Sequence, residues 1–197
     1  MRVILPSIER PKKLPVVLGH NEVRQLLKAP KLLKHRLVLA MLYGCGLRSF
    51  ELCNLQLKDL DLERMMLHIR QGKGRKDRYV PLCAMQVRGL RKYISAESPI
   101  TWCFNGNDSE GNPVALSTTG VRWIVREARK HSGIQKEVTT HSLRHSYATH
   151  LLEMGLDIIS VKDLLGHADI QTTLAYLHVA QLGRQRPFSP LERLYNY

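Results

Sequence analysis

The chain has 197 residues, and 30 Lys and Arg against 17 Asp and Glu give it a formal net charge of +13. This length suits one domain with or without a small appendage, and the charge predicts a polyanionic partner, most commonly nucleic acid. No apolar run approaches the roughly 20 residues that span a bilayer, and neither a signal peptide nor a Lys-rich amphipathic helix is visible. The four cysteines form no C-x-x-C pair, which fits a reducing, cytosolic compartment.

The first third of the chain changes from an irregular to a helical pattern. Prolines and basic residues without periodicity predict an extended basic linker over residues 1–15. Helical spacing of apolar residues begins at Asn21 and ends at Pro30. A second, more hydrophobic helix is expected over residues 33–44 and a third from about Arg48.

The middle of the chain predicts a β-hairpin. Residues 60–70 alternate in polarity, residues 71–77 have turn chemistry, and residues 78–82 return as a strand. Helices are expected at 83–94, 117–132, 141–154, 158–165 and 171–180, with a loop over residues 101–116 and left-handed helix caps at Gly155 and Gly166. The expected fold is therefore mainly α with a small antiparallel β-hairpin or sheet at one edge, an α+β class.

Two residues in the helix expected at 141–154 carry the first chemical signal. His141 and Arg144 are three apart, so they share a face in the first turn, where the helix dipole favours an anion. A guanidinium can bind a phosphate with two hydrogen bonds, although a solvated polar face explains the pair equally well. His141 and His145 have zinc-like spacing, but no carboxylate or thiol completes such a site. We expect neither a metal nor a cofactor.

Four motifs in order make a family resemblance specific. They are G-x-R-x-x-E-L at residues 46–52, G-K-G at 72–74, H-x-L-R-H at 141–145 and L-G-H at 165–167, followed by Tyr176. Arg144 precedes His167 by 23 residues, and Tyr176 follows it by nine. From about Pro15 to Val179 the chain resembles the tyrosine recombinase (phage integrase) family, particularly its Xer-like and transposon-borne members.

The resemblance implies a role for each motif residue. Arg48 and Arg144 would hold the scissile phosphate, His141 and His167 would complete its cradle, and Tyr176 would attack the phosphorus. His141 would also serve in proton transfer, Lys73 would protonate the departing 5′ oxygen, and Glu51 would orient Arg48 or tune the histidines. The product would be a covalent 3′-phosphotyrosine, formed without ATP or metal. Such chemistry needs fixed cations, because charge builds on the phosphate oxygens in the transition state.

Simpler interpretations stay open for several of these residues. Tyr176 lies near Leu174 and Leu177 and could be a core tyrosine, and only its distance from His167 distinguishes it from the other tyrosines. Glu51, one turn from Arg48, could form a helix-surface salt bridge. His145 and His178 are expected to have structural or supporting roles. Phe50 stands where the family usually has a small residue and is expected to face the core.

The hairpin carries a dense basic cluster. Arg70, Lys73, Arg75, Lys76 and Arg78 fall within nine residues. A solvated loop is the plain alternative, but in a chain of this charge we expect phosphate contacts. Lys73 is the expected catalytic member, with Lys76 as the alternative if the register differs.

The resemblance also implies an organisation. Residues 16–182 would form the catalytic domain, and residues 183–197 a tail that related enzymes lend to a neighbouring protomer. Family members usually carry a helical core-binding domain ahead of this one. Either such a domain precedes residue 1 in a longer protein, or the protein is a minimal form. The implied partners are a double-stranded DNA recombination site and further copies of the chain, as a tetramer on DNA in the full-length protein. The implied location is the cytoplasm, for a protein that is bacterial or encoded by a phage or mobile element.

Two other functions remain as alternatives. A non-catalytic regulator would use residues 158–180 as a helix–turn–helix with Gly166 in the turn. It would explain the charge but not the positions of Arg48, Arg144 and His167. A type IB topoisomerase shares the chemistry, but the compact size and the L-G-H motif favour a recombinase.

Overall fold

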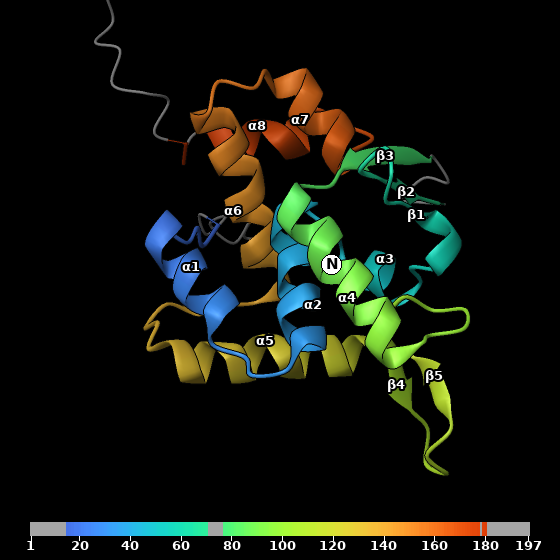
Figure 1. Ribbon diagram of the computed structural model, residues 1–197. Helices are drawn as coiled ribbons and strands as arrows, with labels where there is room; N and C mark the ends of the chain where they lie inside the picture. Colours follow the sequence, from blue (N-terminus) through green and yellow to red (C-terminus); the bar gives the residue numbers. More distant parts are fainter. Residues whose placement is uncertain (1–14, 71–76, 178, 181–197) are drawn as a thin grey trace, which may run out of the picture.

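The computed structural model describes residues 15–70, 77–177 and 179–180. Its α-helices are α1 (His20–Lys28), α2 (Leu33–Gly44), α3 (Ser49–Cys53), α4 (Ala84–Glu97), α5 (Thr118–Ser132), α6 (Thr140–Glu153), α7 (Ile158–Leu165) and α8 (Gln171–Leu177), with a 3-10 turn at Leu57–Asp59. Figure 1 shows α2 inside the bundle, α5 along its lower edge, and α7 and α8 grouped at the upper end of α6. The predicted mainly helical fold is confirmed.

The predicted hairpin is confirmed as part of a three-stranded antiparallel sheet. The order is β1 (Leu60–Asp61), β2 (Met66–Ile69) and β3 (Arg78–Pro81), and the β2–β3 register pairs Ile69 with Arg78. Residues 60–70 are not one strand as predicted. A turn separates β1 from β2, and Met65 at its end has a positive φ of 54°, a conformation that continuous strands do not contain.

The segment expected to be a loop contains a second hairpin. β4 (Asn105–Asn107) pairs with β5 (Pro113–Ala115), and the hairpin projects from the lower edge of the molecule (Figure 1). The Asp108 carboxylate accepts the backbone N–H groups of Glu110 and Asn112, and this closes the turn. Both strands lack a buried apolar face, so the alternation that marks a strand in sequence is missing.

Two clusters of buried apolar side chains hold the helices together. The larger surrounds α2, whose Leu39, Met41 and Leu42 have no exposed surface, as expected for the continuous apolar run over residues 37–43 of this helix. The smaller joins α6, α7 and α8 through residues that include Tyr147, Leu165 and Tyr176. In the described part of the chain, none of the helices has the length and apolar character that a membrane span requires.

The ends of two helices explain where the site residues lie. The Thr139 hydroxyl caps α6 by accepting the N–H of Ser142, so His141 falls in the first turn and Arg144 at the start of the second. Helix α7 ends at Gly166 in a left-handed conformation, with φ of 63°. A Cβ there would lie 2.9 Å from Nη1 of Arg78. Glycine is therefore required both by the backbone and by the guanidinium packed against it.

Candidate active site and nucleic-acid interface

Arg144 is buried and held by the backbone. Its side chain is 4% exposed, and its terminal nitrogens donate to the carbonyl oxygens of Gly46 and Leu165 at 2.5 and 2.6 Å. A guanidinium has five N–H donors, so these two bonds leave others for a ligand. Burial, followed by the nearby charge of Arg48, lowers the pKa of Arg144 to about 10. The side chain therefore stays positively charged near neutral pH.

Glu51 links the arginines beneath the site. Its carboxylate accepts Arg48 Nη1 at 2.8 Å and the Arg48 backbone N–H at 2.9 Å, and it lies 4.0 Å from Nη1 of Arg144. Burial alone would raise the pKa of Glu51. The hydrogen bonds and charges of Arg78 and Arg48 outweigh that effect and lower it to about 2. The contact with Glu51 is the one that the predicted orienting role requires, and the Arg48 side chain that it holds is 22% exposed.

The burial of Arg78 contradicts the expectation that this residue contacts DNA. Its side chain is 8% exposed and forms a two-bond ion pair with Glu51 at 2.8 and 2.9 Å. Its Nε donates to the carbonyl oxygen of Leu164 at 2.8 Å. All three nitrogens are thus engaged inside the protein, because β3 packs against α7. Arg78 ties the sheet to the end of α7 rather than facing a phosphate.

Tyr176 lies between two histidines. Its hydroxyl is 3.1 Å from Nδ1 of His145, and its ring stacks at a tilt of 20° on that of His167, with 6.2 Å between ring centroids. Nδ1 of His167 is oriented by the Thr173 hydroxyl at 2.9 Å. The tyrosine is 4% exposed, and its burial raises the pKa of the phenol against the opposing charges of Arg144 and Arg48.

The structure brings five of the predicted site residues together. Arg48, Glu51 and Arg144 form one cluster. This cluster meets His167 and Tyr176 where Arg144 binds the Leu165 carbonyl and Arg48 Nη2 approaches that of Gly166 at 3.4 Å. Three hairpin residues, Lys73, Arg75 and Lys76, and also His178 and the tail at 183–197, lie outside the described residues.

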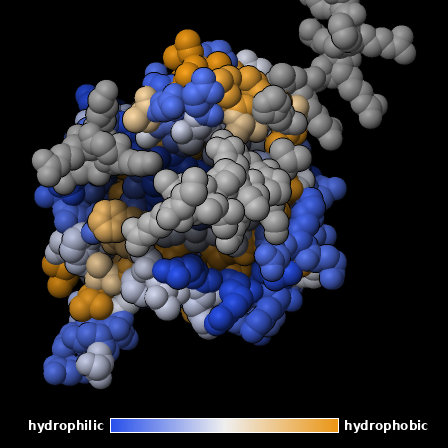
Figure 2. Space-filling model, turned by 180° about the vertical axis from the view of Figure 1, so that it is seen from behind, coloured by the Kyte–Doolittle hydropathy of each residue, from blue (hydrophilic) through white to orange (hydrophobic). Residues whose placement is uncertain are grey.

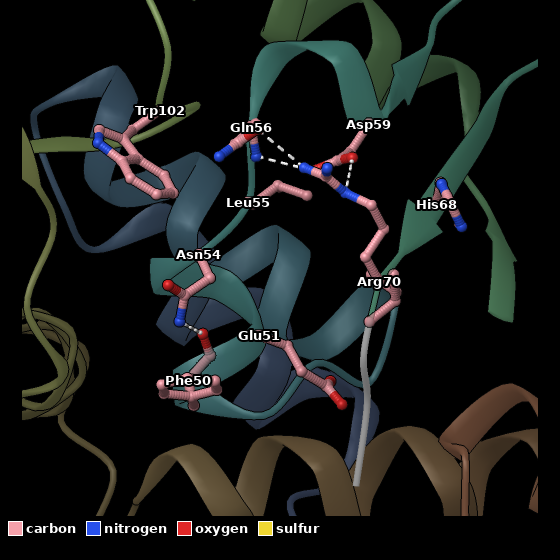
Figure 3. Close-up of a pocket in the computed structure, with 10 residues that line it drawn as sticks. Phe50, Glu51, Asn54, Leu55, Gln56, Asp59, His68, Arg70 and Trp102 are labelled. Carbon is pink, nitrogen blue, oxygen red and sulfur yellow. Dashed lines mark hydrogen bonds and ion pairs between the residues drawn. The ribbon is translucent and has the colours of Figure 1, made fainter. Parts of the chain in front are cut away.

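Arg70 and Phe50 border a pocket next to this cluster. Arg70, which is predicted to contact DNA, binds Asp59 at 2.7 Å and Gln56 at 2.9 Å with a side chain that is 35% exposed (Figure 3). Phe50 does not face the core as predicted. It is 68% exposed, because α3 has only five residues and buries Glu51, Leu52 and Cys53 instead.

A basic groove leads to the site, and the α5 arginines in its lining were not among the predicted site residues. It lies between α5 and the start of α6, and its lining includes Arg48, Phe50, Arg122, Arg126, Arg129 and His141. Figure 2 shows strongly hydrophilic side chains along the lower part of the molecule, where α5 runs. The three α5 arginines repeat at intervals of four and three residues, a spacing that places them on one helix face and could have revealed them.

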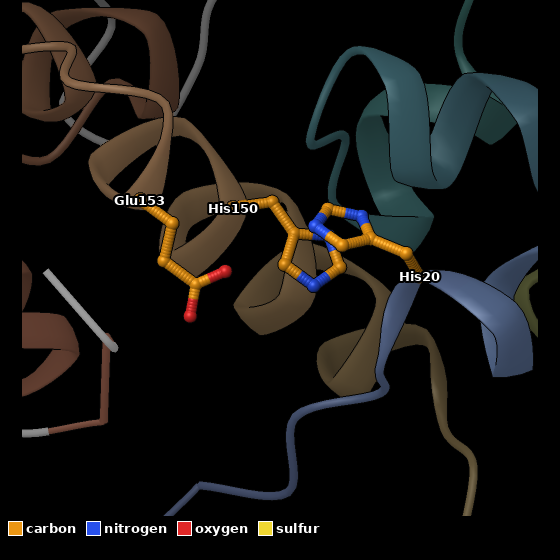
Figure 4. Close-up of side chains that lie close together, drawn as sticks. All are labelled: His20, His150 and Glu153. Carbon is orange, nitrogen blue, oxygen red and sulfur yellow. The ribbon is translucent and has the colours of Figure 1, made fainter. Parts of the chain in front are cut away.

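One group of described residues has the donors for a metal ion. His20, His150 and Glu153 have ligand atoms within 4.8 Å of one another (Figure 4). They join the first residue of α1 to the end of α6, and the Tyr43 hydroxyl lies 2.9 Å from Nδ1 of His150. This group contains none of the residues around Tyr176. His141 and His145 belong to no such group among the described residues.

The sequence profile of the phage integrase family matches residues 16–182. The chain belongs to the phage integrase family. A tyrosine recombinase of Thermosipho africanus is 39% identical over 98% of this chain and 66% of its own length. The tyrosine recombinase XerA of Thermococcus kodakarensis is 40% identical over 86% of this chain and 60% of its own. The chain thus spans about two thirds of these family members' length or less.

Solved structures of the family share the fold. A crystal structure of XerA recombinase superposes with a TM-score of 0.76 at 34% identity, over 86% of this chain and 61% of that one. The XerH site-specific recombinase bound to its palindromic difH substrate gives a TM-score of 0.73 at 27% identity, over 92% of this chain and 53% of that one. The fold of this chain is therefore that of the tyrosine recombinases.

Proposed function

We propose that this chain is the catalytic domain of a tyrosine recombinase, which cuts and rejoins DNA through a covalent 3′-phosphotyrosine. The observation that carries the proposal is the position of Tyr176. Its hydroxyl bonds to His145 and its ring lies on His167, at the end of α7 where Arg48 and Arg144 are held. A nucleophile, two fixed cations and imidazoles together are what metal-free attack on a phosphodiester requires.

The phosphate would bind where positive charge exceeds negative. Three guanidiniums, from Arg48, Arg78 and Arg144, lie within 4.0 Å of the single carboxylate of Glu51. An anion that reaches the exposed side of Arg48 and the remaining donors of Arg144 would balance this excess. His141, exposed at the start of α6, and His167 would complete the contacts to the phosphate oxygens.

The phenol attacks phosphorus, and the 5′ oxygen leaves. An alkoxide is a poor leaving group, so a general acid should matter greatly, and Lys73 is the residue that the family motif assigns. The phosphotyrosine conserves the energy of the broken bond, so rejoining needs neither ATP nor metal. Thr173 supports the reaction indirectly by orienting His167.

Double-stranded DNA is the proposed partner. A basic groove, lined by α5 and His141, continues from Arg48 and would follow the phosphate backbone. The names of similar proteins favour recombination over strand relaxation. A regulator without catalysis would give no reason for holding Arg48 and the buried Arg144 next to Tyr176.

We further propose that the full-length protein assembles as a tetramer on its recombination site in the cytoplasm. Residues 1–15 would link the catalytic domain, residues 16–182, to a preceding core-binding domain, and residues 183–197 would form a tail exchanged between protomers. The length of the family's recombinases, which exceeds that of this chain, supports the additional domain. Analytical ultracentrifugation of the full-length protein with and without its DNA site tests the assembly.

Trapping the covalent intermediate tests the activity. A DNA site nicked next to the cleavage position loses a short fragment after attack, so the adduct accumulates and migrates slowly on a denaturing gel. We expect an adduct with the native chain and none with Tyr176→Phe, while DNA binding is unchanged. An adduct that persists in Tyr176→Phe would exclude this nucleophile. A full-length protein that binds its site and never forms an adduct would favour the regulator.

A further inference from the structure

Among the described residues, His145 is the one whose side chain is hydrogen-bonded to the hydroxyl of the proposed nucleophile. Its Nδ1 lies 3.1 Å from Oη of Tyr176, which is hydrogen-bonding distance. The ring of His141, one turn earlier on α6, is exposed and packs towards His145 with 6.3 Å between ring centroids. Of these two histidines, it is therefore the half-buried one that contacts the phenol.

Building on the function proposed above, we propose that His145 accepts the proton of Tyr176 when the phenol attacks. The family resemblance assigned proton transfer to His141. In the structure the two histidines lie one turn apart on α6 and have different neighbours. His141 lines the groove with Arg48, where a phosphate would lie, and His145 contacts the nucleophile.

The surroundings of His145 keep its imidazole neutral. Burial, then the nearby charges of His141 and Arg144, lower the pKa of His145. A neutral ring whose Nδ1 carries no hydrogen has its lone pair towards the phenol, which then donates. The charged and titratable groups around this pair are His141 and Arg144 on α6, His167 after α7, and Arg48 before α3.

The nearby cations act on both partners of the proton transfer, because Arg144 acts to lower the pKa of Tyr176 and that of His145 alike. Arg144 and Arg48 act to lower the pKa of Tyr176 against its burial, and Arg144 also favours prompt return of the proton from a charged His145. In the forward step the O–H bond of Tyr176 breaks, its proton moves to Nδ1 of His145, and the phenolate oxygen bonds to phosphorus. The bond from phosphorus to the 5′ oxygen breaks, and the general acid protonates that oxygen. In rejoining, the imidazolium returns its proton to the departing phenolate.

A spectroscopic titration tests the contact without requiring DNA cleavage. Tyr176 is replaced by 3-fluorotyrosine in the 197-residue chain, and its ¹⁹F resonance is followed against pH. Titration of His145 should produce an inflection below the pKa of the phenol. This inflection should vanish in His145→Asn, which keeps a hydrogen-bonding group near Nδ1 but cannot take the proton, and should persist in His141→Asn. Loss in His141→Asn and persistence in His145→Asn would overturn the proposal.

Single-turnover cleavage of the nicked DNA site, at saturating protein, tests the catalytic step. A positioned general base contributes on the order of 100-fold or more, so His145→Asn should slow adduct formation by at least that factor and remove the histidine limb from the pH–rate profile. Fluorination of Tyr176 lowers the phenol's pKa, so it should recover part of the loss in His145→Asn and less in His141→Asn. His145→Gln serves as a second variant, and thermal unfolding verifies that each one folds.

The outcomes are separable. A uniform loss of rate with an unchanged pH profile and no recovery on fluorination would assign His145 a structural role only and overturn the proposal. If the native chain binds DNA but forms no adduct while the ¹⁹F inflection depends on His145, the proposed recombinase function fails and the proton contact stands.

Discussion

Arginine has opposite roles in two regions of the molecule: the buried network around Glu51 and the exposed face of α5. Arg78 and Arg144 are 8% and 4% exposed, and backbone carbonyls and Glu51 hold them in place. Arg122 and Arg126 are exposed on the wall of the groove. A buried arginine holds its charge at a defined position, because the surrounding packing excludes other side-chain conformations. An exposed one provides attraction that salt weakens.

The largest effect should come from removing the central carboxylate. Glu51→Gln leaves Arg78 and Arg144 buried without their shared counter-charge, and breaking a buried pair in this way costs about 3–5 kcal/mol. Urea unfolding of the native and variant chains measures the loss. Glu127→Gln, which removes an exposed partner of Lys130 on α5, should leave the midpoint nearly unchanged. Equal effects of the two substitutions would contradict the distinction between the two regions.

Acid should weaken the buried network in a defined pH range. The folded pKa of Glu51 is about 2, below its ordinary value of 4.5. A lowered carboxyl pKa stabilises the fold fully above the unfolded value, and this stability is lost as pH falls towards the folded one. The native chain should therefore lose about 3 kcal/mol more than Glu51→Gln between pH 5 and pH 2. Parallel stability curves for the two chains over that range would refute the assignment.

The salt dependence of DNA binding should separate the two kinds of arginine. If Arg122 neutralises one phosphate, Arg122→Ala should lower the slope of log affinity against log salt by about 0.9. Arg78→Ala should reduce the free energy of unfolding, because Glu51 loses its two-bond ion pair, and leave the slope unchanged. Fluorescence anisotropy of labelled DNA over a range of salt concentrations measures the slopes of both variants. A smaller slope for Arg78→Ala alone would restore the original expectation that Arg78 contacts DNA.

The smallest effect should come from removing the hydrogen bond between Thr173 and His167. Thr173→Val keeps the shape of the side chain but removes the hydroxyl that bonds to Nδ1 of His167. The expected cost is about 1 kcal/mol of unfolding free energy, with a several-fold slower adduct formation because His167 loses its orientation. Thr172→Val, an exposed neighbour on α8, is the matched control. Slower cleavage in the control instead would rule out this role for Thr173.

How much the sequence predicted depended on the range of the interaction. The spacing of apolar residues predicted α2 and α7 with their observed bounds, since both patterns lie within one helix. The exposure of Phe50 and the pairs of β4 and β5 were missed, because a short helix and a short polar hairpin leave no periodic signal.

The sequence by itself indicated the family, because the order and spacing of the motifs can be read directly along the chain. The same spacing selected four candidate site residues: Arg48, Arg144, His167 and Tyr176. Only the tertiary structure decided what each side chain touches. Arg70 and Arg78 both flank the hairpin tip and look alike in sequence, yet Arg78 is buried against Glu51, 27 residues away. His145 meets Tyr176 across 31 residues. Such partners are chosen by the packing of separate elements, and local pattern carries no information about them.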